Sequence, residues 1–196
     1  ERISRDLHDN VGAQITNLIT GIEISNLHIQ KKQQNQALQL LQNLDLEARG
    51  AMNDLRETIW LLDKDELQFG IFLDHLKGYL KRQESYLQGM KIDIQSDIAP
   101  SRILNPTQSL NLTRIIQEAL NNARKYAEAE KFNISFQNYD SKILVKLSDN
   151  GVGMDIEARA NKGNGLQNIE ERSAEINASF TLESEINKGT SITIIF

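Results

Sequence analysis

The sequence predicts an α + α/β architecture, in which a long helical hairpin precedes a two-layer α/β sandwich. Two observations carry this prediction. The first 64 residues contain no proline, and their apolar residues recur at steps of three and four. From about Leu67 onward, helical patterns are mixed with short strand patterns, and turn-forming residues join neighbouring strands directly. Direct hairpins are typical of an α + β sandwich rather than of a doubly wound parallel sheet.

Two amphipathic helices of roughly 30 residues, each about 45 Å long, account for the N-terminal segment. The polar run 30–36 lies between them and predicts the turn. A lone two-helix hairpin buries little surface, and Ile19 and Ile24 lie off the main apolar stripe of the first helix. We therefore expect a homodimer in which two hairpins form a four-helix bundle. The apolar stripes consist of Ile3, Leu7, Val11, Ile15, Leu18 and Ile22, and of Leu38, Leu41, Leu44, Ala48, Met52, Leu55, Ile59 and Leu62.

The C-terminal part carries the elements of the sandwich. Residues 67–196 are predicted to form this domain and residues 1–66 the hairpin, with a hinge around 64–70. Pro106 lies near the start of a long helix, where proline is favoured. Helices are predicted over 71–88, 107–127 and 166–177, and strands over 90–98, 132–137, 143–148, 180–185 and 191–196.

The amino-acid composition excludes several classes of function. The net charge of −5 gives no electrostatic footprint for nucleic acid, so no direct nucleic-acid binding is expected. Because cysteine is absent, disulfides, thiolate catalysis and cysteine-ligated zinc are excluded. No apolar run approaches the ~20 residues of a membrane helix. The chain opens inside a helical pattern without Met. We expect a cytoplasmic portion of a longer protein that is membrane-anchored only through a missing upstream segment.

A histidine beside an acid marks the first helix. Leu7 belongs to the apolar stripe, so His8 lies about 100° around the helix, at the solvent edge. A carboxylate such as Asp9 can hold one imidazole proton and leave the other ring nitrogen as a nucleophile. Taken alone, the pair is more typical of an ordinary polar surface.

Acid, amide and lysine side chains gather on the predicted helix 107–127. Glu118 and Asn122 are four residues apart and share a helix face. Carboxylate and amide oxygens suit a hard cation such as Mg²⁺, which also binds phosphate. Lys125 adds positive charge nearby. In isolation, the pattern is more typical of an ordinary polar helix face.

Two glycine-containing loops follow. After the strand 143–148, Asp149 precedes Gly151 and Gly153, and an acid there can accept a hydrogen bond from an exocyclic amine such as that of adenine. Gly163 and Gly165 open the helix that begins near Leu166, where backbone N–H groups can cradle phosphates. Each loop alone is a weak signal, and neither matches a Walker A or a Rossmann fingerprint.

The order and spacing of these motifs resemble the dimerisation and catalytic domains of sensor histidine kinases. The chain is most similar to the subfamily that pairs with LuxR/NarL-type response regulators. Residues 5–12 resemble the H-box, 55–62 the second-helix segment, 117–123 the N-box, 149–154 the G1 box and 163–166 the G2 box. Gly189-Thr190 resembles the glycine-threonine pair before the last strand.

This resemblance implies a fold, an activity and a set of roles. The fold is the Bergerat-type (GHKL) ATP-binding sandwich, and the activity is autophosphorylation with ATP and Mg²⁺, followed by transfer to an aspartate of a response regulator. It implies that His8 is the phospho-acceptor and Asp9 its base partner, and that Glu118 and Asn122 lie at the Mg²⁺–ATP site. The adenine amine would bind Asp149, assisted by Gly153 and Thr190. Gly163 and Gly165 would belong to a lid over the phosphates.

At two positions this chain departs from the family pattern, and these departures limit which residue roles the resemblance implies. Many members have a histidine where this chain has Tyr126, which cannot supply positive charge to a phosphate. Some members also place a glutamine five residues after the histidine, in a pattern tied to phosphatase activity. Here that position is Ala13, and Gln14 is one helical step away. Phosphatase activity is therefore left open.

Two alternative functions follow from the same residues. One is a Bergerat-fold serine kinase of the anti-sigma type, which would lack the long hairpin bearing His8. The other is a signalling module that binds nucleotide without catalysis, as the departure at Tyr126 would allow. The chemical stability of a phosphoryl label distinguishes the first, and nucleotide binding without labelling would indicate the second.

Overall fold

A computed structural model describes residues 2–83, 89–156 and 165–196. Within these ranges the side chains of 2–14, and of a few further positions in the second helix, are not described. The chain divides into two compact units, Glu1–Asp63 and Lys64–Phe196. Among the described helices, none combines the length and the apolar character needed to cross a bilayer.

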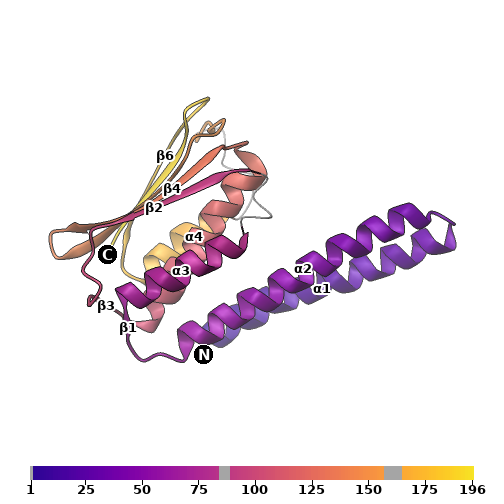
Figure 1. The fold of residues 1–196 in the computed structure, drawn as a ribbon, viewed down its shortest axis with the longest axis horizontal. Helices are drawn as coiled ribbons and strands as arrows, with labels where there is room; N and C mark the ends of the chain where they lie inside the picture. Colours follow the sequence, from indigo (N-terminus) through magenta and orange to yellow (C-terminus); the bar gives the residue numbers. More distant parts are fainter. Residues whose placement is uncertain (1, 84–88, 157–164) are drawn as a thin grey trace. The chain divides into compact units, whose positions relative to one another are not determined.

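The first unit is the predicted helical hairpin, which the structure confirms (Figure 1). Helix α1 spans Arg2–Gln30 and helix α2 spans Gln34–Leu62. The turn between them uses Lys32 at a positive φ of 58°. The two helices approach closely at Gly21, where an added Cβ would overlap the side chain of Leu44. A side chain at this position would require the end of the Leu44 side chain to move.

The hairpin leaves much of its apolar surface uncovered. Where side chains are described, few apolar residues of α1 and α2 are buried, chiefly Ala37, Leu44 and Leu61. Ile19 is 53% exposed and Ile24 is 42% exposed, and both were predicted to lie off the main stripe. Exposed apolar area on this scale is a feature of interaction surfaces. The other large apolar residues exposed on this unit are Ile15, Ile22, Leu27, Ile29, Leu38, Leu41, Met52 and Ile59.

The second unit is a sandwich of one five-stranded sheet and three helices, which confirms the predicted class (Figure 1). The strand order is β2-β4-β5-β7-β6, and helices α3, α4 and α5 cover one face of the sheet. The helices are α3 (Phe69–Gln83), α4 (Pro106–Tyr126) and α5 (Gly165–Glu175). The strands are β2 (Lys91–Ser96), β4 (Lys131–Tyr139), β5 (Lys142–Asp149), β6 (Ser179–Glu185) and β7 (Gly189–Ile195).

One pairing in the sheet is parallel, which the hairpin signals did not predict. Strand β2 runs parallel to β4, with Ile92 opposite Phe132 and Ile94 opposite Ile134, whereas the other pairs are antiparallel. The chain between β2 and β4 includes α4, and a crossover of this kind is what a parallel pair requires.

A small second sheet was also missed. Strands β1 (Leu67–Gln68) and β3 (Ile103–Leu104) pair antiparallel. The next backbone N–H groups, of Phe69 and Gly70, donate to the carbonyls of Arg102 and Pro100 at 2.7 and 2.9 Å. The predicted hinge over 64–70 is therefore too long, because residues 67–70 are bonded into the second unit.

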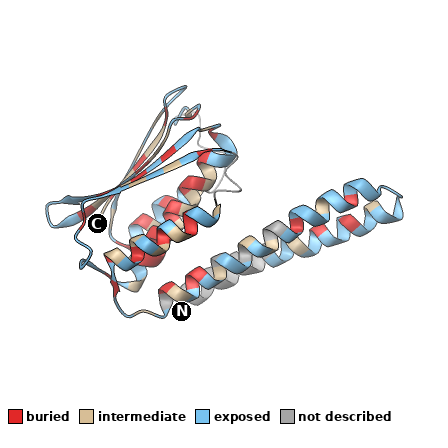
Figure 2. Cartoon of the chain, viewed as in Figure 1, coloured by how far each residue is buried: buried red, intermediate tan, exposed pale blue. Residues whose placement is uncertain are grey.

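The core of the second unit lies between the sheet and its helices (Figure 2). Phe69 and Phe72 of α3 pack on Phe136 of β4, with ring centroids 5.3 and 6.3 Å from that of Phe136. All three side chains are at most 1% exposed. The alternating burial of β4 and β5 gives each strand one face toward this core. The core thus fixes α3 and α4 against the strands that end at the pocket described below.

Helix α4 begins with a capping box. The side chain of Asn105 accepts the backbone N–H of Gln108 at 2.8 Å, and Gln108 Oε1 accepts the backbone N–H of Asn105 at 3.0 Å. We expect Asn105→Ala to lower the free energy of unfolding by about 1 kcal/mol, measured by urea denaturation of the second unit's transition. The exposed neighbour Thr107→Ala is the control, and an equal loss there would contradict a capping effect.

Candidate functional site

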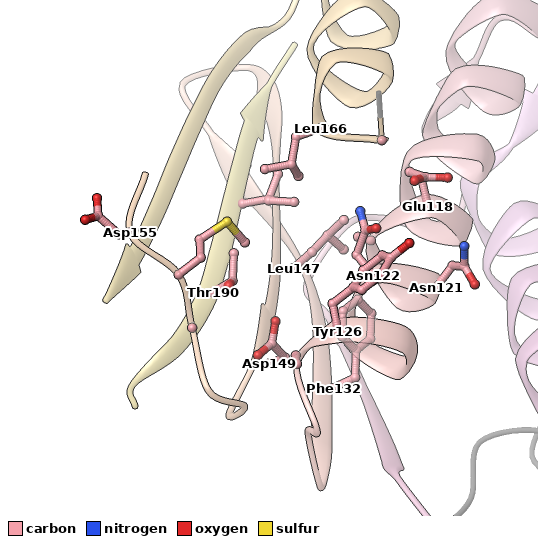
Figure 3. A pocket seen from close by; sticks show the side chains of 16 residues that line it. Glu118, Asn121, Asn122, Tyr126, Phe132, Leu147, Asp149, Asp155, Leu166 and Thr190 are labelled. Atoms are coloured by element: carbon pink, nitrogen blue, oxygen red, sulfur yellow. The ribbon is translucent and has the colours of Figure 1, made fainter. Parts of the chain in front are cut away.

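A pocket of about 740 Å³ opens at one end of the sandwich (Figure 3). Its walls come from the C-terminal half of α4, the ends of β5 and β7, the loop after β5 and the first residues of α5. The volume is in the range of small-molecule and cofactor sites. Four stretches of the chain that are separate in the sequence therefore contribute to one cavity.

Most of the residues singled out in the sequence lie in this pocket. Of the predicted nucleotide-site residues, those that line it are Glu118, Asn122, Asp149, Gly153, Gly165, Leu166 and Thr190. Lys125 is exposed and Gly151 is buried, and neither is a lining residue. Gly163 falls outside the described residues. His8 and Asp9 lie on α1 in the other unit, where their side chains are not described.

Asp149 ends strand β5 inside the pocket. Its Oδ1 accepts the backbone N–H of Gly151 at 2.9 Å, and its carboxylate also accepts the backbone N–H of Thr190. Burial raises the pKa of Asp149, and the two backbone hydrogen bonds oppose that rise only in part. The carboxylate is thus held in a fixed orientation, with its remaining acceptor sites available to a ligand.

The loop after Asp149 is fixed at two glycines. Gly153 has a positive φ of 62°, and an added Cβ would overlap the carbonyl oxygen of Glu185 in the β6–β7 hairpin. At Gly151 an added Cβ would overlap the carbonyl oxygen of Ala127, just beyond α4. Val152, between the two glycines, accepts the backbone N–H of Asn187 at 2.7 Å. The loop is therefore held between the end of α4 and the terminal hairpin.

We expect Gly153→Ala to destabilise the protein by about 2 kcal/mol or more, because it adds both backbone strain and a steric overlap. Gly89→Ala is a matched control, since Gly89 also has a positive φ, of 92°, but no atom of the described residues lies within 4 Å of an added Cβ. Thermal denaturation of the two variants measures the difference. Equal losses would show that the contact with Glu185 contributes nothing.

The other end of the pocket carries hard oxygen donors. Glu118 and Asn122 project from α4, and an added Cβ on Gly165 would overlap Glu118 Oε1. The buried Nδ2 of Asn122 has no hydrogen-bond partner among the described residues. Because buried amides are normally hydrogen-bonded, this nitrogen indicates that a polar ligand completes the site.

Several lining residues were not among the predicted site residues. The apolar ones include Phe132, Leu147 and Ile192, which face inward from β4, β5 and β7, together with Met154. Strand alternation would have found Leu147, two residues before Asp149, and Ile192, two residues after Thr190. The polar ones are Asn121, Tyr126 and Asp155. Tyr126 lies four residues after Asn122, which in turn lies four residues after Glu118, so the spacing could have placed Tyr126 on the same helix face. From the sequence it was considered only as a departure from the family pattern.

The arrangement has the chemistry of a nucleotide site. Apolar side chains enclose a slot, an oriented carboxylate lies at one end, and a carboxylate and an amide lie at the other. Such a site can hold a flat apolar ring with an exocyclic donor, and a cation with its phosphates.

Family comparisons agree with this geometry. Residues 1–67 match the family described as "Histidine kinase". Residues 107–196 match the family described as "Histidine kinase-, DNA gyrase B-, and HSP90-like ATPase". The chain is homologous to histidine kinases over both of these regions. The resemblance stated from the motifs is therefore confirmed, and the two matched regions fall in the hairpin and in the sandwich.

Individual relatives are sensor proteins. Sensor protein VraS of Staphylococcus epidermidis is 28% identical over 206 residues, covering 99% of this chain and 54% of that protein. VraS of Staphylococcus aureus is 28% identical over 209 residues with the same coverage. The chain thus spans about half the length of these curated relatives.

Solved structures of histidine kinases share the fold. The histidine kinase AdeS of Acinetobacter baumannii aligns with a TM-score of 0.59 at 16% identity, covering 96% of each chain. The mycobacterial sensor histidine kinase MprB aligns with a TM-score of 0.51 at 16% identity, covering 67% of this chain and 95% of that one. At such identities the likeness establishes the architecture, and the site must be judged from its own residues.

Proposed function

We propose that this chain is the ATP-dependent autokinase portion of a two-component sensor, and that it phosphorylates its own His8. The observation that carries the proposal is that motif residues from α4, β5 and β7 line one pocket. Glu118, Asp149 and Thr190 are far apart in the sequence, so their convergence is independent support for a nucleotide site. The two family matches support the same activity.

In this proposal the adenine lies in the apolar slot, with its amine donating to Asp149. The phosphates extend toward α5, whose first residue, Gly165, also lines the pocket. Backbone N–H groups at the start of a helix favour negative charge there. Asn122 supplies an amide near the same end, where its unpartnered Nδ2 can donate to a phosphate oxygen.

Glu118 and Asn122 fit a Mg²⁺ ion in donor type, because both offer hard oxygens from one helix face. When bound, Mg²⁺ would neutralise phosphate charge and hold the triphosphate in one orientation. No group of three or more His, Asp or Glu residues able to hold a metal occurs among the described residues. An ion here would therefore be held jointly by α4 side chains and by the nucleotide.

The acceptor in this proposal is a ring nitrogen of His8. That nitrogen forms a bond to the γ-phosphorus while the bond from this phosphorus to the bridging oxygen breaks, and ADP leaves. Asp9 orients the imidazole and takes its proton. Catalysis is otherwise a matter of positioning and of charge neutralisation. The phosphoryl group then passes to an aspartate of a response regulator, for which the LuxR/NarL type is proposed.

We further propose that the working form is a homodimer built on the hairpin. The exposed isoleucines of α1, which include Ile15, Ile19 and Ile22, support this. A second hairpin would cover them and complete a four-helix bundle. Anchoring of the full-length protein to a membrane is a proposal of the same kind, and would depend on a segment outside this chain.

Incubation with γ-labelled ATP tests the activity. We expect label that is lost in acid and retained in base, as is typical of phosphohistidine. Acid-stable label would indicate the serine-kinase alternative instead. ATP binding without any label would contradict the autokinase proposal and favour a module that binds nucleotide without catalysis.

Nucleotide binding is expected to depend on pH through Asp149. Burial raises the pKa of this carboxyl above 3.8, so the carboxylate is protonated at a higher pH than an ordinary aspartate. The ionised form is the stronger hydrogen-bond acceptor. ADP affinity should therefore fall as the pH is lowered toward the raised pKa of Asp149. Titration calorimetry from pH 7 down to about pH 4 measures it.

The pH dependence of folding stability through Asp149 has the opposite sign to the pH dependence of ADP affinity. Burial disfavours the charged form of Asp149, so in the absence of nucleotide its contribution to stability is fully present below the unfolded-state pKa. That contribution is lost as the pH rises through the raised folded-state pKa. Asp149→Asn should remove both effects, and an unchanged acid slope of ADP affinity in that variant would assign the dependence to another group.

A further inference from the structure

Ser184 lies at the centre of a hydrogen-bond cluster beside the pocket. It is a half-buried residue of the edge strand β6. Its Oγ accepts the backbone N–H of Met154 at 2.9 Å, and lies 2.9 Å from the carbonyl oxygen of Gly189 and 3.0 Å from Thr190 Oγ1. Met154 and Thr190 line the pocket, whereas Ser184, which contacts both, is not a lining residue. The cluster thus connects a residue outside the pocket to two residues of its wall.

The direction of each hydrogen bond follows from counting protons. A carbonyl oxygen can only accept, so the single hydroxyl proton of Ser184 goes to Gly189. Oγ of Ser184 then has no proton left for Thr190. In the contact between the two hydroxyls, Thr190 must be the donor and Ser184 the acceptor. The hydroxyl proton of Thr190 is therefore turned toward Ser184.

This assignment determines what Thr190 offers to a ligand. With its proton committed to Ser184, Thr190 Oγ1 presents only lone pairs to the pocket. The backbone N–H of Thr190 is bonded to the carboxylate of Asp149, so these two acceptors are adjacent. A ligand group placed between them must be a donor. An exocyclic amine meets this requirement, whereas an oxo group would face acceptors on both sides.

We propose that Ser184 is a positioning residue, which holds the Thr190 hydroxyl as an acceptor and so makes the site prefer a 6-amino purine over a 6-oxo purine. This rests on the proposed function, because it assigns a base preference to the same ATP site. Ser184 acts through Thr190 and does not touch the nucleotide. A site whose fixed polar groups would be left unpaired by the wrong substrate discriminates strongly against it.

The test compares the dissociation constants of ADP and inosine diphosphate by calorimetry, using the whole chain. In Ser184→Ala the Thr190 hydroxyl can rotate and donate to an oxo group. We expect the preference for ADP to shrink about fivefold, the effect of one net hydrogen bond. The conservative variant Ser184→Thr, which keeps the hydroxyl, should retain the wild-type preference. If Ser184→Ala does not fold, Ser184→Cys, with its weakly hydrogen-bonding thiol, replaces it.

A double mutant separates positioning from general packing. In a Thr190→Val background there is no hydroxyl to orient, so adding Ser184→Ala should leave the ratio of the two constants unchanged. A loss of ADP and inosine diphosphate affinity by the same factor in Ser184→Ala would overturn the proposal and leave a merely structural role. Such a result would not affect the ATP site itself. If the wild-type chain bound neither nucleotide, the proposed function would fail, and this inference with it.

Discussion

His8→Gln is expected to abolish autophosphorylation, with incorporated label falling at least about 100-fold, to background. Glutamine is of similar size and polarity but has no nucleophilic ring nitrogen to attack the γ-phosphorus. The position lies within α1, where glutamine is a good helix former, so the hairpin should remain folded. ADP affinity should be unchanged, because every described residue that lines the pocket belongs to the second unit. Filter binding of label and calorimetry of ADP measure the two quantities separately.

His28→Gln is the matched control for this result. His28 lies on the same helix, and its Nδ1 is 2.7 Å from Gln33 Oε1 near the turn of the hairpin. The substitution removes one imidazole from α1 without touching the H-box, so labelling should stay within about twofold of wild type. Full labelling of a folded His8→Gln chain would refute the assignment of the acceptor.

Long periodic elements of this fold were predictable from the sequence. The ranges of α1, α2 and α4 follow the apolar spacing, and the strands β4 and β5 follow alternation and turn residues. The pair β1–β3 was not predictable, because two-residue strands are too short to show a period. The parallel pairing of β2 with β4 was missed because strand direction depends on the crossover through α4, and not on the pattern within β2.

The residues of the site also divide into those that the sequence could predict and those that it could not. Asp149 and Gly153 were predictable because an acid and glycines directly after a strand place a carboxylate beside backbone that a ligand can approach closely. Lys125 was assigned to the site by charge and nearness in sequence, yet it does not line the pocket, whereas the exposed Tyr126 does. One residue shifts a side chain by about 100° around a helix, which separates these neighbours. Ser184 had no signal, because its contacts depend on how the β6–β7 hairpin closes on the loop after β5.

Asp149→Asn is expected to weaken ADP binding about 30-fold, as the loss of a hydrogen bond to a charged acceptor would. Asparagine keeps one oxygen for the backbone N–H of Gly151, but it replaces the other oxygen with an NH₂ donor. An amide donor directed at the adenine amine would repel it. Calorimetry at neutral pH measures the loss, and label incorporation at low ATP concentration should fall in parallel.

Stability is expected to respond differently from binding in Asp149→Asn. Because burial raises the pKa of Asp149, the charged carboxylate opposes folding at neutral pH, and a neutral amide removes that cost. The melting temperature should therefore be equal to or above that of wild type while affinity is lost. Asp155→Asn is the matched control, since Asp155 also lines the pocket but is exposed, and its affinity should change less than about threefold. A destabilised Asp149→Asn chain, or equal losses of affinity in the two variants, would mean that the carboxylate of Asp149 holds the loop together and does not recognise the base.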